Sequence, residues 1–114
     1  MEQPPQALPV IALVRDLLFA TRISSTAHAL SVPVKMVRDP HQLNADAARC
    51  LIVDLNLPGA IDAAVGWKAT QGGPVVGFVS HVDTATIEHA RSAGIDRVVA
   101  RSQFVQILPQ LLAP

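Results

Sequence analysis

The chain has 114 residues, half of them hydrophobic, and its mean hydropathy is positive, so we expect one domain with an aliphatic core. Basic and acidic residues number nine each, and this balance argues against a protein that binds nucleic acid through a basic surface. The apolar block at 10–20 is shorter than the roughly 20 residues that a membrane span needs. Cys50 has no second cysteine to pair with, so we expect a reducing, cytoplasmic location. Residues 1–9 are predicted to be a disordered tail, and 10–114 the folded domain.

Strand patterns recur along the chain from residue 10 onward. Five short runs rich in apolar and β-branched residues predict strands over 10–14, 32–37, 50–55, 74–79 and 96–100. The second run alternates in character and contains Pro33, which suits an edge strand or the start of a strand. The other runs are mostly apolar throughout, as expected for strands that are covered on both faces.

Helical patterns follow each of these strands. Apolar residues at helical spacing, with capping residues, predict helices over about 19–30, 40–49, 61–70, 84–93 and 102–111. Asp39 and Asp83 are expected to cap two of these helices, and Gly94 to end one of them. Pro109 lies inside the last helix and should kink or shorten it, because proline lacks the backbone N–H.

Alternating strands and helices imply right-handed crossovers and a parallel sheet with helices on both faces. The predicted fold is therefore an α/β fold of flavodoxin-like type, with a five-stranded, doubly wound parallel sheet. In such sheets, ligands bind at the carboxyl ends of the strands.

Polar side chains follow the predicted strands at that edge. Asp54 closes an apolar strand, where burying its charge costs several kcal/mol unless a partner compensates it. Carboxylate and amide oxygens on short loops suit Mg²⁺, and a carboxylate beside Mg²⁺ can accept a phosphoryl group. Two plainer interpretations stay open: Asp54 caps the next turn, and Asp16 is only a salt-bridge partner of Arg15, Arg22 or Arg101.

The segment Asp54-x-Asn56-x-Pro58-Gly59 resembles the phosphorylation loop of response-regulator receiver domains, and the resemblance covers about 10–112. It implies that Asp54 is the phosphoacceptor. It also implies that Asp16, Asp54 and the Asn56 carbonyl would be the Mg²⁺ ligands.

The pocket departs from the family pattern at several positions. Arg15 replaces the first of two acids, so it would compete with Mg²⁺ and pair with Asp54 or Asp16. Arg101 replaces the family's lysine, and Ser80 follows one position after the place of the switch hydroxyl, which Val79 takes. By the resemblance, Arg15, Ser80 and Arg101 would line the phosphate pocket. The short spacing between Asp16 and Asp54 predicts a trimmed second strand or helix.

Three functional hypotheses follow from these residues. The first is an atypical, stand-alone receiver-like signalling module without an output domain, a pseudo-receiver that acts through protein–protein contacts. The second is a phosphorylatable, Mg²⁺-dependent receiver that takes a phosphoryl group on Asp54 from a partner histidine kinase. The third, a small enzyme acting on a phosphate or acyl substrate, lacks a glycine-rich phosphate loop or a nucleophile elbow, so we expect no enzyme.

The expected partner is a histidine kinase, a downstream signalling protein or a second copy of the chain. We predict that it binds an exposed apolar surface of the last helix, formed by Phe104, Leu108, Leu111 and Leu112.

Overall fold

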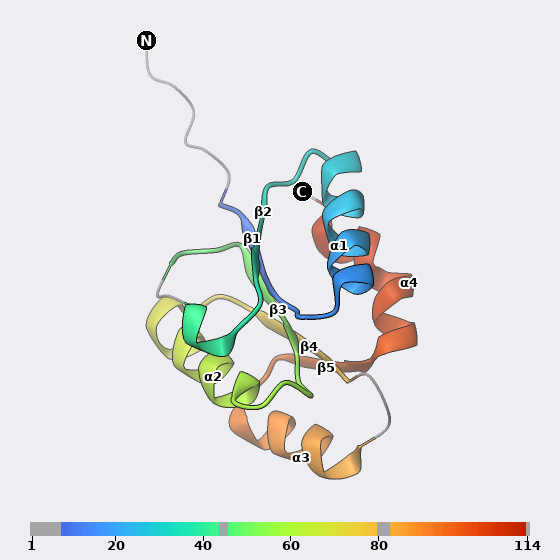
Figure 1. The fold of residues 1–114 in the computed structure, drawn as a ribbon. Helices are drawn as coiled ribbons and strands as arrows, with labels where there is room; N and C mark the ends of the chain where they lie inside the picture. The colour runs from blue at the N-terminus through green and yellow to red at the C-terminus, as the bar shows by residue number, and fades with distance from the viewer. Residues whose placement is uncertain (1–7, 44–45, 80–82, 114) are drawn as a thin grey trace.

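The computed structural model describes residues 8–43, 46–79 and 83–113. Five parallel strands form one sheet in the order β2-β1-β3-β4-β5 (Figure 1). They are β1 (Val10–Leu13), β2 (Val34–Val37), β3 (Cys50–Asp54), β4 (Val75–Val79) and β5 (Arg97–Ala100). This strand order is that of flavodoxin-like sheets, so the predicted fold class is confirmed.

Helices cover both faces of the sheet. α1 (Leu17–Ala29) and α4 (Arg101–Leu112) lie on one face, and α2 (Ala60–Gln71) and α3 (Thr84–Ala93) lie on the other (Figure 1). Strands β1, β3 and β4 are buried along their whole length because both of their faces are covered. The edge strand β2 alternates between partly buried, exposed and buried residues, as its sequence predicted.

The core between the sheet and the α1–α4 pair contains all three phenylalanines of the chain. The ring centroids of Phe19 and Phe78 lie 4.6 Å apart, and those of Phe78 and Phe104 lie 4.8 Å apart. Such close ring pairs add to the stabilisation that their buried area already provides. On the α2–α3 face the core is mainly aliphatic, with Trp67 as its one aromatic residue among the buried members.

The connection from β2 to β3 differs from the prediction. The helix expected to run to about residue 49 is only a 3-10 turn, Pro40–Gln42, with Asp39 as its cap. Residues 46–49 are not helical, and two contacts hold them: the Trp67 indole N–H donates to the Asp46 carbonyl at 2.9 Å, and the Arg49 N–H donates to the Pro9 carbonyl at 2.9 Å. The trimmed second strand or helix stays a prediction.

The last helix also corrects the sequence prediction. α4 begins at Arg101 rather than Ser102 and continues past Pro109 to Leu112, so the proline does not shorten it. Its carbonyls at Leu111 and Leu112 accept hydrogen bonds from the Arg49 guanidinium, which caps this end of the helix.

The expected interaction surface on this helix is wrong. Phe104, Leu108 and Leu112 are at most 1% exposed, and Leu111 is partly buried against the same core. The apolar side of α4 packs onto the sheet and α1, because it is the side that completes this core. It is therefore not available to a partner.

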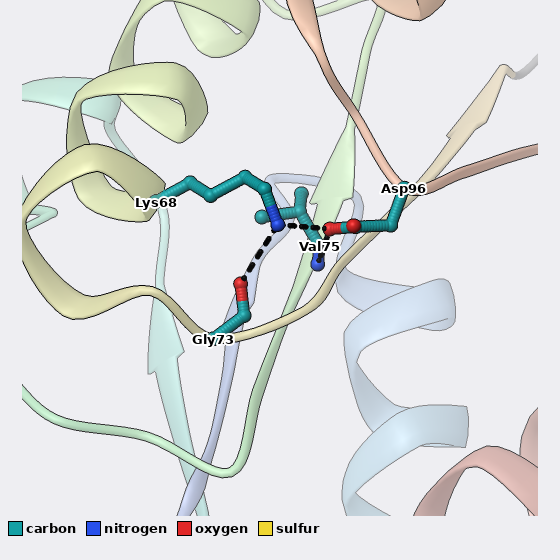
Figure 2. Close-up of polar contacts among 4 residues, drawn as sticks. All are labelled: Lys68, Gly73, Val75 and Asp96. Carbon is teal, nitrogen blue, oxygen red and sulfur yellow. Dashed lines mark hydrogen bonds and ion pairs between the residues drawn. The ribbon is translucent and has the colours of Figure 1, made fainter.

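A salt bridge at the amino-terminal edge of the sheet ties α2 to β4 and β5 (Figure 2). The Lys68 ammonium lies 2.7 Å from the Asp96 carboxylate and also donates to the Gly73 carbonyl. The same Asp96 oxygen accepts the Val75 N–H at 2.7 Å. The Lys68 ammonium, followed by the Val75 N–H, holds the pKa of Asp96 below its ordinary value, against the opposing effect of burial.

None of the helices in the described part of the chain has the length and apolar character needed to cross a membrane.

Candidate functional site

Asp54 occupies the position that the sequence predicted, at the carboxyl end of the central strand β3. Its side chain is 8% exposed, and its carboxylate accepts the Asn56 N–H at 3.0 Å. It lines a cleft of about 300 Å³, and the other described residues around this cleft are Val14, Arg15, Asp16, Phe19, Leu57, Phe78 and Arg101. The loop after it turns into α2 through Gly59, whose φ of +80° is a conformation that favours glycine.

Asp16 has two roles beside this cleft. One carboxylate oxygen accepts the Phe19 N–H at 3.0 Å and so caps α1, and the other accepts from the Arg101 guanidinium at 3.1 Å. The Phe19 N–H, followed by Arg101, lowers the pKa of Asp16 below its ordinary value. The carboxylate is therefore ionised at neutral pH. The expectation that Asp16 pairs with one of the arginines is met by Arg101.

Arg101 contacts both Asp16 and Phe19 at this site. Its guanidinium lies 4.5 Å from the centre of the Phe19 ring while it holds Asp16, an arrangement that adds a cation–π contact to the ion pair. Arg101 and Phe19 line the Asp54 cleft and also a groove of about 600 Å³ between α1 and α4. These two side chains thus form part of the wall of both hollows.

Arg15 lies in the same cleft but does not make the expected ion pair. Its Nε donates to the Arg38 carbonyl at 3.3 Å, beside the end of β2. In the described part of the chain, the ion pairs are Lys35–Asp46, Lys68–Asp96 and Arg101–Asp16. The predicted pairing of Arg15 with Asp54 or Asp16 is therefore corrected, since Arg101 reaches Asp16 from the end of β5.

Two predicted pocket residues remain, Asn56 and Ser80. Asn56 is half-buried in the loop after β3 and is not among the residues that line the cleft. Ser80 lies outside the described residues. Val79, which takes the position of the switch hydroxyl, is a buried member of the core on the α2–α3 face.

Phe19 and Phe78 belong to the site, although the sequence indicated only a core role for Phe19 and placed Phe78 in a strand. Phe78 pairs with Asp54 across β3 and β4, which brings its ring to the cleft. The signal for Phe19 was its place three residues after Asp16, where a helix cap and the first buried residue adjoin.

The donor groups of the cleft, as arranged, do not fit a divalent cation. Among the described residues, no three His, Cys, Asp or Glu side chains gather where they could hold a metal. Both oxygens of Asp16 accept hydrogen bonds, and Arg15 adds a second guanidinium to the same cleft. A metal ion would have to displace Arg101 from Asp16 and would lie in a cleft with two positive side chains.

Comparison with known proteins finds similarity in structure. No protein-family model matches the chain, and no curated protein matches its sequence. The phosphorylated phytochrome response regulator RcpA of a cyanobacterium is 19% identical, with a TM-score of 0.78 over 93% of this chain and 91% of that one. A Burkholderia pseudomallei response regulator with a phosphorylated aspartic acid, a calcium ion and citrate is 15% identical, with a TM-score of 0.76 over 92% of this chain and 66% of that one. The BeF3-activated receiver domain of DrrB from Thermotoga maritima is 17% identical, with a TM-score of 0.79 over 94% of this chain and 95% of that one.

Proposed function

We propose that this chain, which has the fold of response-regulator receiver domains, is a signalling module that acts through contact with a protein partner. The observation that carries the proposal is the position of Asp54, a nearly buried carboxylate that ends the central strand and lines a cleft with Asp16 and Arg101. We infer that this cleft is the control point of the module, because ligands of such sheets bind at this edge. We propose that the module has no catalytic turnover of its own.

In the first form of this function, the cleft stays in one state and the module is recognised without phosphorylation. The contacts of Asp16 with Arg101 and with the start of α1 support this form, because they occupy both oxygens of the acid. The partner would be a histidine kinase or a downstream signalling protein. Leu17 and Leu18 are 66% and 84% exposed on the first turn of α1, and they offer apolar surface beside the cleft.

In the second form, Asp54 accepts a phosphoryl group from a partner histidine kinase. The observation that favours this form is the cleft itself, which places the Asp54 carboxylate beside a hollow of about 300 Å³. Two of the similar structures are of proteins described as phosphorylated, one of them on an aspartic acid. The Mg²⁺ dependence expected for this form conflicts with the donor groups of the cleft, where Arg101 already holds Asp16.

One titration separates the two forms. Mg²⁺ and then beryllofluoride, a mimic of a phosphoryl group, are added while amide NMR spectra are recorded, with Asp54→Ala as the control. Shifts that cluster at Asp16, Asp54 and Arg101 in the native chain and vanish in Asp54→Ala would establish the second form. Unchanged spectra at saturating beryllofluoride would rule it out and leave the first.

A further inference from the structure

Among the described residues that line the Asp54 cleft, the charges balance without any added ion. Two guanidinium groups, Arg15 and Arg101, and two carboxylates, Asp16 and Asp54, line the same hollow. If position 15 carried an acid, three carboxylates would face one cation, and an incoming phosphoryl group would need a divalent cation to offset its charge. Arginine in place of that acid changes the formal charge by two units, which is the charge of such a cation.

Both arginines line the cleft beside Asp54. Arg101 is only partly buried, and its partner Asp16 keeps the Phe19 N–H if Arg101 leaves. Arg15 is exposed and is held by one hydrogen bond of 3.3 Å to a backbone carbonyl. A guanidinium binds phosphate oxygens through two parallel hydrogen bonds, so each arginine gains by turning to a phosphoryl group.

We propose that Arg15 and Arg101 together take the place of a divalent cation, so that Asp54 accepts and holds a phosphoryl group without metal. The inference rests on the second form of the proposed function and states how that form works in this chain. The donor is a small acyl phosphate or a phosphorylated partner protein. With an acyl phosphate, an Asp54 oxygen bonds to phosphorus while the phosphorus–oxygen bond to the donor carboxylate breaks. The donor carboxylate leaves with the electron pair.

The test uses acetyl phosphate and intact-protein mass spectrometry on the full chain, in EDTA and in Mg²⁺. We expect the native chain to gain one phosphoryl group in EDTA to the same extent as in Mg²⁺, and Asp54→Ala to gain none. Arg15→Asp should lose the adduct in EDTA by about tenfold or more and regain it in Mg²⁺, because the added acid restores the need for a cation. Arg15→Gln should lose the phosphoryl adduct in EDTA and should not regain this adduct in Mg²⁺.

Arg91→Asp is the matched control, since it makes the same charge change at an exposed position of α3. It should behave like the native chain, and amide spectra confirm that each variant is folded. An adduct that forms only in Mg²⁺ overturns the inference and leaves phosphoryl acceptance by Asp54 standing. An adduct in EDTA that Arg15→Asp does not reduce also overturns it. No adduct in either buffer overturns the inference for acyl phosphate donors, while the beryllofluoride titration decides the second form separately.

Discussion

Two ion pairs lie at opposite edges of the sheet and serve different purposes. Lys68 and Asp96 meet at the amino-terminal edge, where the Asp96 oxygen also accepts a backbone N–H from β4 (Figure 2). Arg101 and Asp16 meet at the carboxyl-terminal edge, beside the cleft that Asp54 lines. In both pairs, hydrogen bonds lower the pKa of the aspartate.

The surroundings of each pair explain the difference. The first pair joins a helix to the starts of two strands, so breaking it loosens the connection between three elements. The second pair lies where two hollows adjoin, and Arg101 lines both of them. The same charges therefore tie elements of the fold together at one edge and lie beside a cleft at the other.

The largest expected effect comes from the aromatic core that supports the carboxyl-terminal edge. Phe104→Ala removes a fully buried ring that contacts Phe19 and Phe78, and should lower the free energy of unfolding by about 3–5 kcal/mol. Urea denaturation measures the loss, with Val105→Ala, a half-buried neighbour, as the control. A loss under about 1 kcal/mol would show that the ring cluster contributes little.

The next largest effect is expected from breaking the Lys68–Asp96 pair at the amino-terminal edge. Asp96→Asn removes the charge that Lys68 binds and should cost about 1 kcal/mol, since both side chains are roughly a third or more exposed and solvent screens the pair. Urea denaturation in low and high salt measures it, with exposed Glu88→Gln as the control. Equal stability of Asp96→Asn and Glu88→Gln would contradict the structural role of this pair.

The pH dependence of stability tests the same pair in a second way. Because the folded pKa of Asp96 is below its ordinary value of 3.8, its contribution is complete above that value. It is lost as the pH falls through the folded pKa, when the native carboxylate becomes protonated. Urea midpoints measured from about pH 6 down to pH 2 should fall less steeply in Asp96→Asn than in the native chain. Parallel curves would argue against the lowered pKa.

The smallest effect on stability is expected at the carboxyl-terminal edge. Asp16→Asn keeps a good helix cap but loses the charge that holds Arg101, so the urea midpoint should hardly change. The Arg101 Nε–H resonance and the amides lining the cleft should shift instead. A drop in stability as large as that of Asp96→Asn would erase the distinction between the two pairs.

Much of the fold was predictable from local signals. Apolar, β-branched runs and helical patterns placed the five strands and four of the helices, because buried strands and amphipathic helices carry these patterns in their own residues. Asp83 and Gly94 bound α3 as predicted, since capping depends on neighbouring backbone groups. The helix expected over 40–49 was wrong: residues 46–49 are not helical, and they bond instead to Trp67 and Pro9, which are distant in sequence.

The sequence predicted which residues form the site better than it predicted which of them pair. Arg15, Asp16, Asp54 and Arg101 were expected at one edge because the carboxyl ends of parallel strands converge there, and they line one cleft. Which arginine binds Asp16 depended on how β5 and α4 sit against α1. The inward orientation of Phe104, Leu108 and Leu112 likewise depended on which side of α4 meets the sheet.

The run from Cys50 to Gly59 determined by itself that a carboxylate would close a buried central strand and be followed by a tight turn, because both properties are local. The tertiary structure alone decided what that carboxylate faces. Arg101 is 85 residues from Asp16, and only the packing of β5 and α4 against α1 brings its guanidinium to Asp16 and onto the Phe19 ring. A guanidinium reaches several acceptors at similar distance, so side-chain charge alone does not select its partner.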